Sequence, residues 1–174
     1  MERRDWFIAG AACLNGMTAK MFRRKTTCTA ESWREFRAAA SALPGFPSTA
    51  SFENFRRGDE KTKAYLLCGA LAYLDADRLP TARAAILDFG REGCHEQNLR
   101  YYRDYVQFGR NLGQGHLFVA TLPSTPLSEA AIALHLHGPA RYVDSLGRWE
   151  ALREAVDMHF SIDGLDAVLV FHYG

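Results

Sequence analysis

The stretch from Leu122 to Gly147 constrains the fold more than any other part of the sequence. Residues 127–136 carry apolar side chains at helical spacing, and the Gly138-Pro139 pair then turns the chain. Residues 140–145 predict a short strand, and residues 148–160 predict a second helix. A strand that lies between two helices in this way is typical of a parallel sheet with right-handed helical crossovers.

Three further apolar runs, at 6–13, 83–90 and 166–172, have the length of strands. The first is bounded by turn residues and predicts a strand buried on both faces. Helical spacing recurs over 29–43, 61–76 and 95–109. The sequence therefore predicts one α/β domain over residues 1–174, interrupted by a loop at 44–60 that is rich in Gly, Pro, Ser and Thr.

The helix expected at 148–160 has two unlike faces. Arg153 and Asp157 belong to a charged side, whereas Trp149, Leu152 and Val156 belong to an apolar side. We therefore expect this helix to pack with one face only and to leave its charged face in water.

Composition excludes several classes of partner. The formal net charge of +1 gives no global field for nucleic acid or membrane, and no run of about 18 apolar residues is present to span a bilayer. At the N-terminus, positive charge is followed by an apolar stretch, as in a signal peptide. The apolar run is short, however, and ends at Asn15-Gly16, which favours a buried strand. The four cysteines show no CxxC spacing, so we expect reduced thiols in a cytoplasmic protein.

A few polar residues are of the types found in catalytic or metal sites, but their spacing in the sequence does not fit such a site. Cys94 and His95 are neighbours in the sequence, and adjacent residues of a helix do not face each other, so an activated thiol is not expected. His135 and His137 have metal-ligand spacing on a strand but not on a helix, and no thiol or carboxylate lies close in sequence. We expect no metal and no cofactor. The basic run at 20–25 is that of a solvated loop.

The order of these pieces resembles the N-terminal half of β-ketoacyl-[acyl-carrier-protein] synthases, in the thiolase-like superfamily. The segments that carry the resemblance are Trp6–Cys13, Asp59–Leu74, Arg83–Gly90, Leu117–Ser124 with Gly138-Pro139, Tyr142–Ser145 and Leu165–Val170. The resemblance covers nearly the whole chain, with residues 14–60 matching least. It implies a half thiolase-like α/β domain whose mostly parallel four-stranded sheet has the order 3-2-1-4, with helices on both faces.

Two departures from the family bear on activity. The nucleophilic cysteine of the family is expected after Ser145-Leu146, and the residue there is Gly147. A cysteine at that helix N-terminus attacks the acyl thioester, and glycine has no side chain to acylate. The two catalytic histidines of the family belong to a C-terminal half that this sequence does not contain. The resemblance thus implies a vacated catalytic site.

The first hypothesis for function is a catalytically inactive accessory or partner subunit in fatty-acid or polyketide-type biosynthesis. The resemblance implies a homodimer, or a heterodimer with a full-length ketosynthase, and an acyl carrier protein as a further partner. The exposed sheet edge expected to form the interface consists of Ala140, Arg141, Tyr142, Val143 and Asp144.

Two alternatives stay open. One is a residual acyl transferase or thioesterase that uses Ser145 or Cys94. A serine nucleophile needs a positioned base, and His116 or His172 would have to supply it through the fold. The other alternative is an interaction domain without acyl chemistry.

Overall fold

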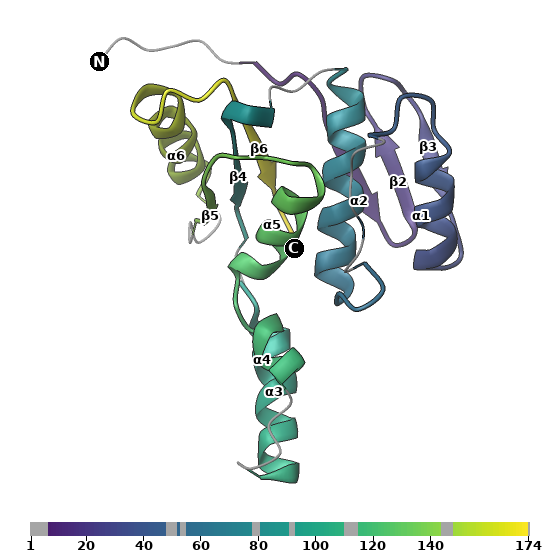
Figure 1. Ribbon diagram of the computed structural model, residues 1–174, viewed down its shortest axis with the longest axis vertical. Helices are drawn as coiled ribbons and strands as arrows, with labels where there is room; N and C mark the ends of the chain where they lie inside the picture. The colour runs from purple at the N-terminus through teal and green to yellow at the C-terminus, as the bar shows by residue number, and fades with distance from the viewer. Residues whose placement is uncertain are drawn as a thin grey trace.

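The chain folds into two small sheets that share one central helix. The computed structural model describes residues 7–47, 52, 55–77, 81–90, 93–109, 115–143 and 148–173. Within these ranges the chain forms six α-helices and two three-stranded sheets, one antiparallel and one parallel (Figure 1).

The first sheet is an antiparallel meander near the N-terminus. Its strands are β1 (Ala12–Asn15), β2 (Thr18–Met21) and β3 (Thr27–Thr29). Gly16, in the turn between β1 and β2, has a φ of 57°, a conformation that glycine adopts at little cost. The helix α1 (Trp33–Ser41) follows, and the Ser32 hydroxyl accepts a hydrogen bond from the Glu35 amide at its N-terminus. This confirms a helix within the predicted range 29–43.

The helix α2 (Glu60–Asp75) is the centre of the molecule. Asp59 caps its N-terminus by accepting a 2.8 Å hydrogen bond from the Thr62 amide. The helix packs on α1, β1 and β2 on one side and on α5 (Ser124–Ala133) and β6 (Ala167–Phe171) on the other (Figure 1). Its side chains are therefore buried nearly all round, which explains why its sequence is apolar on most sides.

The second sheet is parallel and has the order β5-β4-β6. Its central strand β4 (Ala84–Asp88) is preceded by the short 3-10 turn η1 (Thr81–Arg83) and is buried at every residue, although its last residue is an aspartate. The edge strand β5 (Ala140–Tyr142) and β6 lie on either side of it. The predicted strands at 83–90, 140–145 and 166–172 are thus confirmed, with shorter bounds.

Helices cover both faces of this parallel sheet. The helices α2 and α5 pack on the face that carries Ile86 and Leu169, and α6 (Trp149–Ser161) packs on the face that carries Leu87 and Val168. Leu152 and Val156 of α6 are buried, whereas Arg153 is exposed, so the expected one-sided packing is confirmed. Trp149 is the exception, with 64% of its surface exposed.

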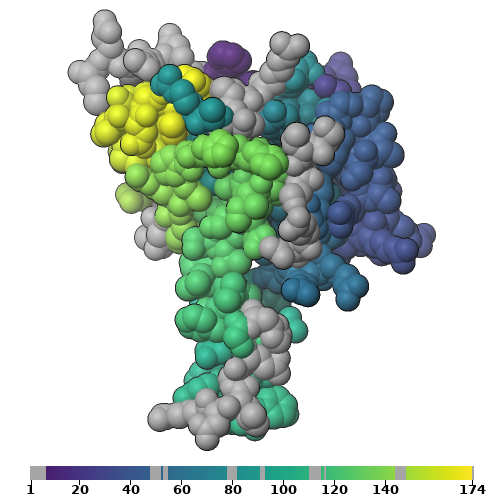
Figure 2. Space-filling model, viewed as in Figure 1, coloured from purple at the N-terminus to yellow at the C-terminus, as the bar shows by residue number. Residues whose placement is uncertain are grey.

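Two helices form an arm that projects from the rest of the molecule. They are α3 (His95–Phe108) and α4 (Gly115–Ala120), which pack on each other. Figures 1 and 2 show the arm extending well beyond both sheets. No residue of α3 is buried, although the helix is 14 residues long.

The predicted four-stranded parallel sheet with the order 3-2-1-4 is wrong. In that order the segment 6–13 would lie between the strands that became β4 and β6, but β4 pairs directly with β6. Within the described part of that segment, residues 7–11 belong to neither sheet, and Phe7 and Ile8 are 85% and 78% exposed.

Local pairing explains the difference. The last two residues of the expected strand, 12 and 13, belong to β1, and the chain then turns at Gly16 and pairs with the next few residues, which costs little loop-closure entropy. The Asp75 carboxylate then fixes both ends of the β1–β2 hairpin to α2, because it accepts hydrogen bonds from the amides of Ala11, Arg23 and Arg24 at 2.9, 3.0 and 2.8 Å. The expected central strand is therefore not formed, and only its last two residues join a sheet, the antiparallel one.

Candidate functional site

The carboxyl ends of the parallel strands meet at one edge of the second sheet. Asp88 ends β4, Tyr142 ends β5, and His172 and Tyr173 follow β6. In open α/β sheets, ligands bind in the crevice outside these strand ends. This carboxyl edge is therefore the place at which a site is expected.

Asp88 is the centre of a buried polar network at the carboxyl edge. Its side chain is fully buried, and the ammonium of Lys61 donates to one of its oxygens at 2.9 Å. The Tyr65 hydroxyl donates to the other oxygen at 2.8 Å. Lys61 also donates to the Gly93 carbonyl at 2.9 Å. The charges of Lys61 and Asp88 are thus paired with each other inside the protein.

The positions of these residues follow from the helix α2. Lys61 and Tyr65 are one turn apart and point to the same side, where β4 ends. Lys61 is 2% exposed and its ammonium lies 5.3 Å from the centre of the Tyr65 ring and 5.7 Å from that of Tyr173. Burial, helped by the negative charge of Asp88, raises the pKa of the Tyr65 hydroxyl, which therefore stays protonated. The network is a fixed arrangement of two donors, Lys61 and Tyr65, beside the Asp88 carboxylate.

Cys94, the thiol singled out from the sequence, borders this network. It is 3% exposed and precedes α3 without capping it by a side-chain hydrogen bond. Burial raises the pKa of the thiol; the positive charge of Lys61 opposes this rise, and the charges of Asp59 and Asp88 add to it. A thiol that is buried and protonated at neutral pH is a poor nucleophile. The neighbouring His95 is exposed.

An aromatic group forms the outer part of the carboxyl edge. The rings of Phe89 and Trp149 lie 5.0 Å apart between centroids, and His172 lies 5.7 Å from Phe89. The Nδ1 atom of His172 is 2.5 Å from the Phe89 carbonyl oxygen, and because a carbonyl only accepts, Nδ1 is the donor. One nitrogen of His172 is thus used to hold the ring in place.

Several residues predicted for a site lie outside the described residues. These are Asp144, Ser145 and the vacated position Gly147. The side chain of His116 is not described either, so no base for Ser145 is identified. Ala140 to Tyr142 form the edge strand β5, and Val143 follows it.

The histidines weighed as metal ligands lie at the surface of the molecule. His135 and His137 are both exposed, in the turn between α5 and β5. Across the ranges that the structure describes, no three His, Cys, Asp or Glu side chains are grouped as metal ligands.

Sequence reasoning missed the Lys61–Asp88–Tyr65 network. One signal was available, because Asp88 is the one charged residue of the strand β4. A charged residue in such a segment needs a partner of opposite charge. The pairing itself depends on how α2 crosses the sheet, and the sequence does not contain that information.

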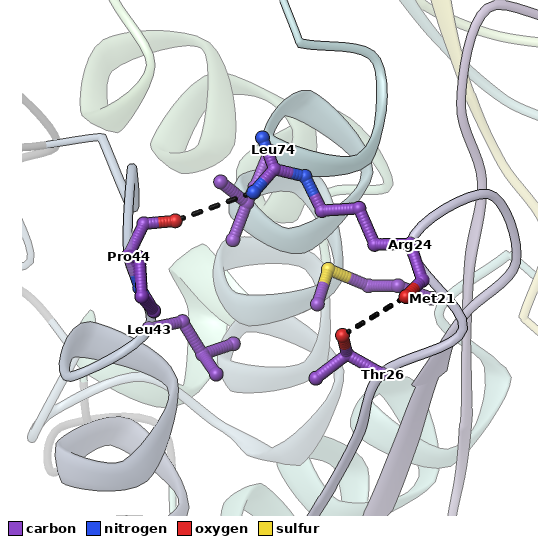
Figure 3. A pocket seen from close by; sticks show the side chains of 6 residues that line it. All are labelled: Met21, Arg24, Thr26, Leu43, Pro44 and Leu74. Atoms are coloured by element: carbon purple, nitrogen blue, oxygen red, sulfur yellow. Dashed lines mark hydrogen bonds between the residues drawn. The ribbon is translucent and has the colours of Figure 1, made fainter.

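A hollow lies away from the carboxyl edge, where the first sheet meets the C-terminal end of α2 and the residues that follow α1. Its volume is about 350 Å³. Figure 3 shows Arg24 reaching across it toward Pro44, whose carbonyl accepts a 3.3 Å hydrogen bond. Arg24 also forms a 2.6 Å ion pair with Asp77. Its charge is therefore engaged within the protein, consistent with a structural role for this part of the basic run. The residues that line the hollow are Met21, Arg24, Thr26, Leu43, Pro44 and Leu74.

Comparisons with known proteins add no family. No model of a known protein family matches the chain, and a search of curated proteins gives no significant match. Among the helices in the described ranges, none combines the length and apolar character needed to cross a membrane.

Proposed function

We propose that this chain is a catalytically inactive partner subunit that acts in the cytoplasm, in acyl-chain assembly of the ketosynthase type. Two independent considerations support the inactive role. In the sequence, glycine occupies the position at which the family has its nucleophile. At the carboxyl edge of the parallel sheet, the charged groups bind one another and the nearby thiol is buried.

The second consideration carries the proposal. A general base must reach the proton that it abstracts, and Asp88 is fully buried, with its oxygens hydrogen-bonded to Lys61 and Tyr65. A nucleophile needs access and a lowered pKa, and Cys94 has neither. The described part of the carboxyl edge therefore favours a structural role for these groups.

The acyl-chain setting comes from the sequence resemblance alone, because the sheet order of the structure differs from that of the family. The partners proposed in this setting are a full-length ketosynthase and an acyl carrier protein. The interface proposed for a ketosynthase partner is the edge strand β5, which has neighbours on one side only among the described strands.

Intact-mass spectrometry tests the inactive role. The purified chain is incubated with acetyl- and malonyl-thioesters of an acyl carrier protein, and an active ketosynthase serves as the positive control. We expect no acyl adduct on the chain and no release of free acid. An adduct that disappears in Ser145→Ala or Cys94→Ala, but not in Cys13→Ala, would instead establish the residual acyl transferase.

Binding tests the acyl-chain setting separately. Calorimetric titration of the chain with holo acyl carrier protein, and co-elution with a ketosynthase, are expected to show complex formation. If neither partner binds, the chain is an interaction domain without acyl chemistry. In that case the inactive role stands and the acyl-chain setting is wrong.

A further inference from the structure

The outer face of α3 carries a stripe of apolar side chains that nothing described in the structure covers. Leu99, Tyr102 and Val106 recur at spacings of three and four residues, which places them on one face. Their exposed fractions are 41%, 63% and 64%. The opposite side of the helix faces α4, where Tyr101 and Phe118 pack at 5.8 Å between ring centroids.

A helix with this little burial is not stable by itself. Isolated helices shorter than about 12–15 residues are marginal in water, and helices in proteins depend on packing of an apolar face. Among the described residues, α4 packs on one side of α3, and the outer stripe on the other side has the spacing of a coiled-coil seam. The outer stripe therefore requires an occupant.

The charged residues beside the outer stripe indicate which partner can bind to it. Glu96 and Arg103 are two helical turns apart and flank the outer stripe on the same side, and both are exposed. An antiparallel pair of identical helices brings the N-terminal half of one beside the C-terminal half of the other. In that arrangement Glu96 faces the partner's Arg103, and by symmetry the same ion pair forms twice.

We infer that a second copy of this chain binds here, through antiparallel pairing of α3 with the partner's α3. With the two-fold axis midway between Leu99 and Tyr102, Leu99 packs on the partner's Tyr102 and Val106 on the partner's His95. Because the arm projects from both sheets (Figure 2), the two bodies lie at opposite ends of the paired helices. The inference is independent of the proposed function, which places a ketosynthase partner on β5.

Sedimentation equilibrium over a range of concentrations tests the pairing. The wild-type chain is expected to dimerise reversibly, and Tyr102→Ser to weaken the dimer about tenfold or more, because large exposed aromatic residues dominate such contacts. Tyr102 lies outside both hydrophobic cores, so its replacement should leave the two sheets and α2 folded, which circular dichroism verifies. A chain that stays monomeric at all concentrations contradicts the inference.

A charge swap separates this pairing from any other dimer. Glu96→Arg and Arg103→Glu are each expected to weaken dimerisation about tenfold, and the two changes together are expected to restore it. Arg100→Glu is the matched control, because Arg100 lies further round the helix from the outer stripe, and it should leave dimerisation unchanged. Failure of the double variant to recover overturns the inference.

The same variants distinguish the alternatives. A dimer that is insensitive to the α3 variants but is abolished by Arg141→Pro, which removes an amide from the edge strand β5, would assign dimerisation to β5 and overturn the pairing of α3.

Discussion

The buried ion pair between Lys61 and Asp88 makes the sharpest prediction about stability. The two charged atoms are 2.9 Å apart, and their side chains are 3% and 0% exposed. At an effective dielectric constant of about 20, two unit charges at this separation attract by about 6 kcal/mol. Removal of both ions from water costs several kcal/mol each, so the net value of the pair is small.

Loss of only one partner of the ion pair should destabilise the protein much more. Lys61→Met leaves the carboxylate of Asp88 buried with only the Tyr65 hydroxyl as a donor. We expect this variant to lower the free energy of unfolding by about 3–5 kcal/mol, because an uncompensated charge remains inside the protein. Asp88→Asn should cost a similar amount, since it leaves the ammonium of Lys61 unpaired.

A double-mutant cycle measures the coupling. Urea unfolding is followed by circular dichroism for the wild type, the two single variants and the double variant. We expect the double variant to lose about 2–3 kcal/mol less than the sum of the single losses. Arg153→Met, which removes an exposed ion pair with Asp157 at 4.0 Å, is the control and should cost under about 1 kcal/mol. Additive losses at Lys61 and Asp88 would refute the reasoning.

Three further perturbations have defined outcomes. Burial tends to raise the pKa of the Asp75 carboxyl, but hydrogen bonds from the amides of Ala11, Arg24 and Arg23 outweigh burial, so its pKa is lowered. Stability from this group is present above the ordinary carboxyl pKa of about 4 and is lost as pH falls through the lowered value; Asp75→Asn should cost about 1.5–3 kcal/mol at pH 7 and flatten the acid limb of a pH–stability curve. Iodoacetamide at pH 8 should label Cys13 much faster than the other three cysteines of the native chain. Cys13 is exposed, whereas Cys28 and Cys94 are buried, and burial, with a smaller effect of Cys13, raises the pKa of Cys68 to about 12. Four labels by intact mass without denaturant would contradict this. Gly138→Ala should lower the free energy of unfolding by about 1–3 kcal/mol, because its Cβ would lie 2.3 Å from the Ala84 carbonyl oxygen, whereas Gly115→Ala, with nothing within 4 Å, should be neutral or stabilising; equal effects would refute the steric argument.

Secondary structure was predictable where the pattern of apolar and polar residues within one segment determines it. The helical spacing of 29–43 predicted α1, and the apolar run at 83–90 predicted a strand. The charged side of α6 correctly indicated contact with solvent. In each case the periodicity of a single element determined the outcome.

The arrangement of the elements was not predictable in the same way. The run at 6–13 has the composition of a central strand, but its outcome depends on competition between distant pairing and a local hairpin. Asp75 decides that competition from more than 50 residues away along the chain, through amides that any residue could provide. The Lys61–Asp88 pair was not predictable for a related reason, because the residue that contacts Lys61 depends on how α2 crosses β4.

The position of α2 has a consequence for how the molecule comes apart. Neither sheet has a complete hydrophobic core without this helix, since its side chains contribute to both. Thermal unfolding should therefore be a single cooperative transition, and neither sheet should survive as an excised fragment. The amide hydrogens of α3, which shares none of that core, should exchange with solvent long before those of β4.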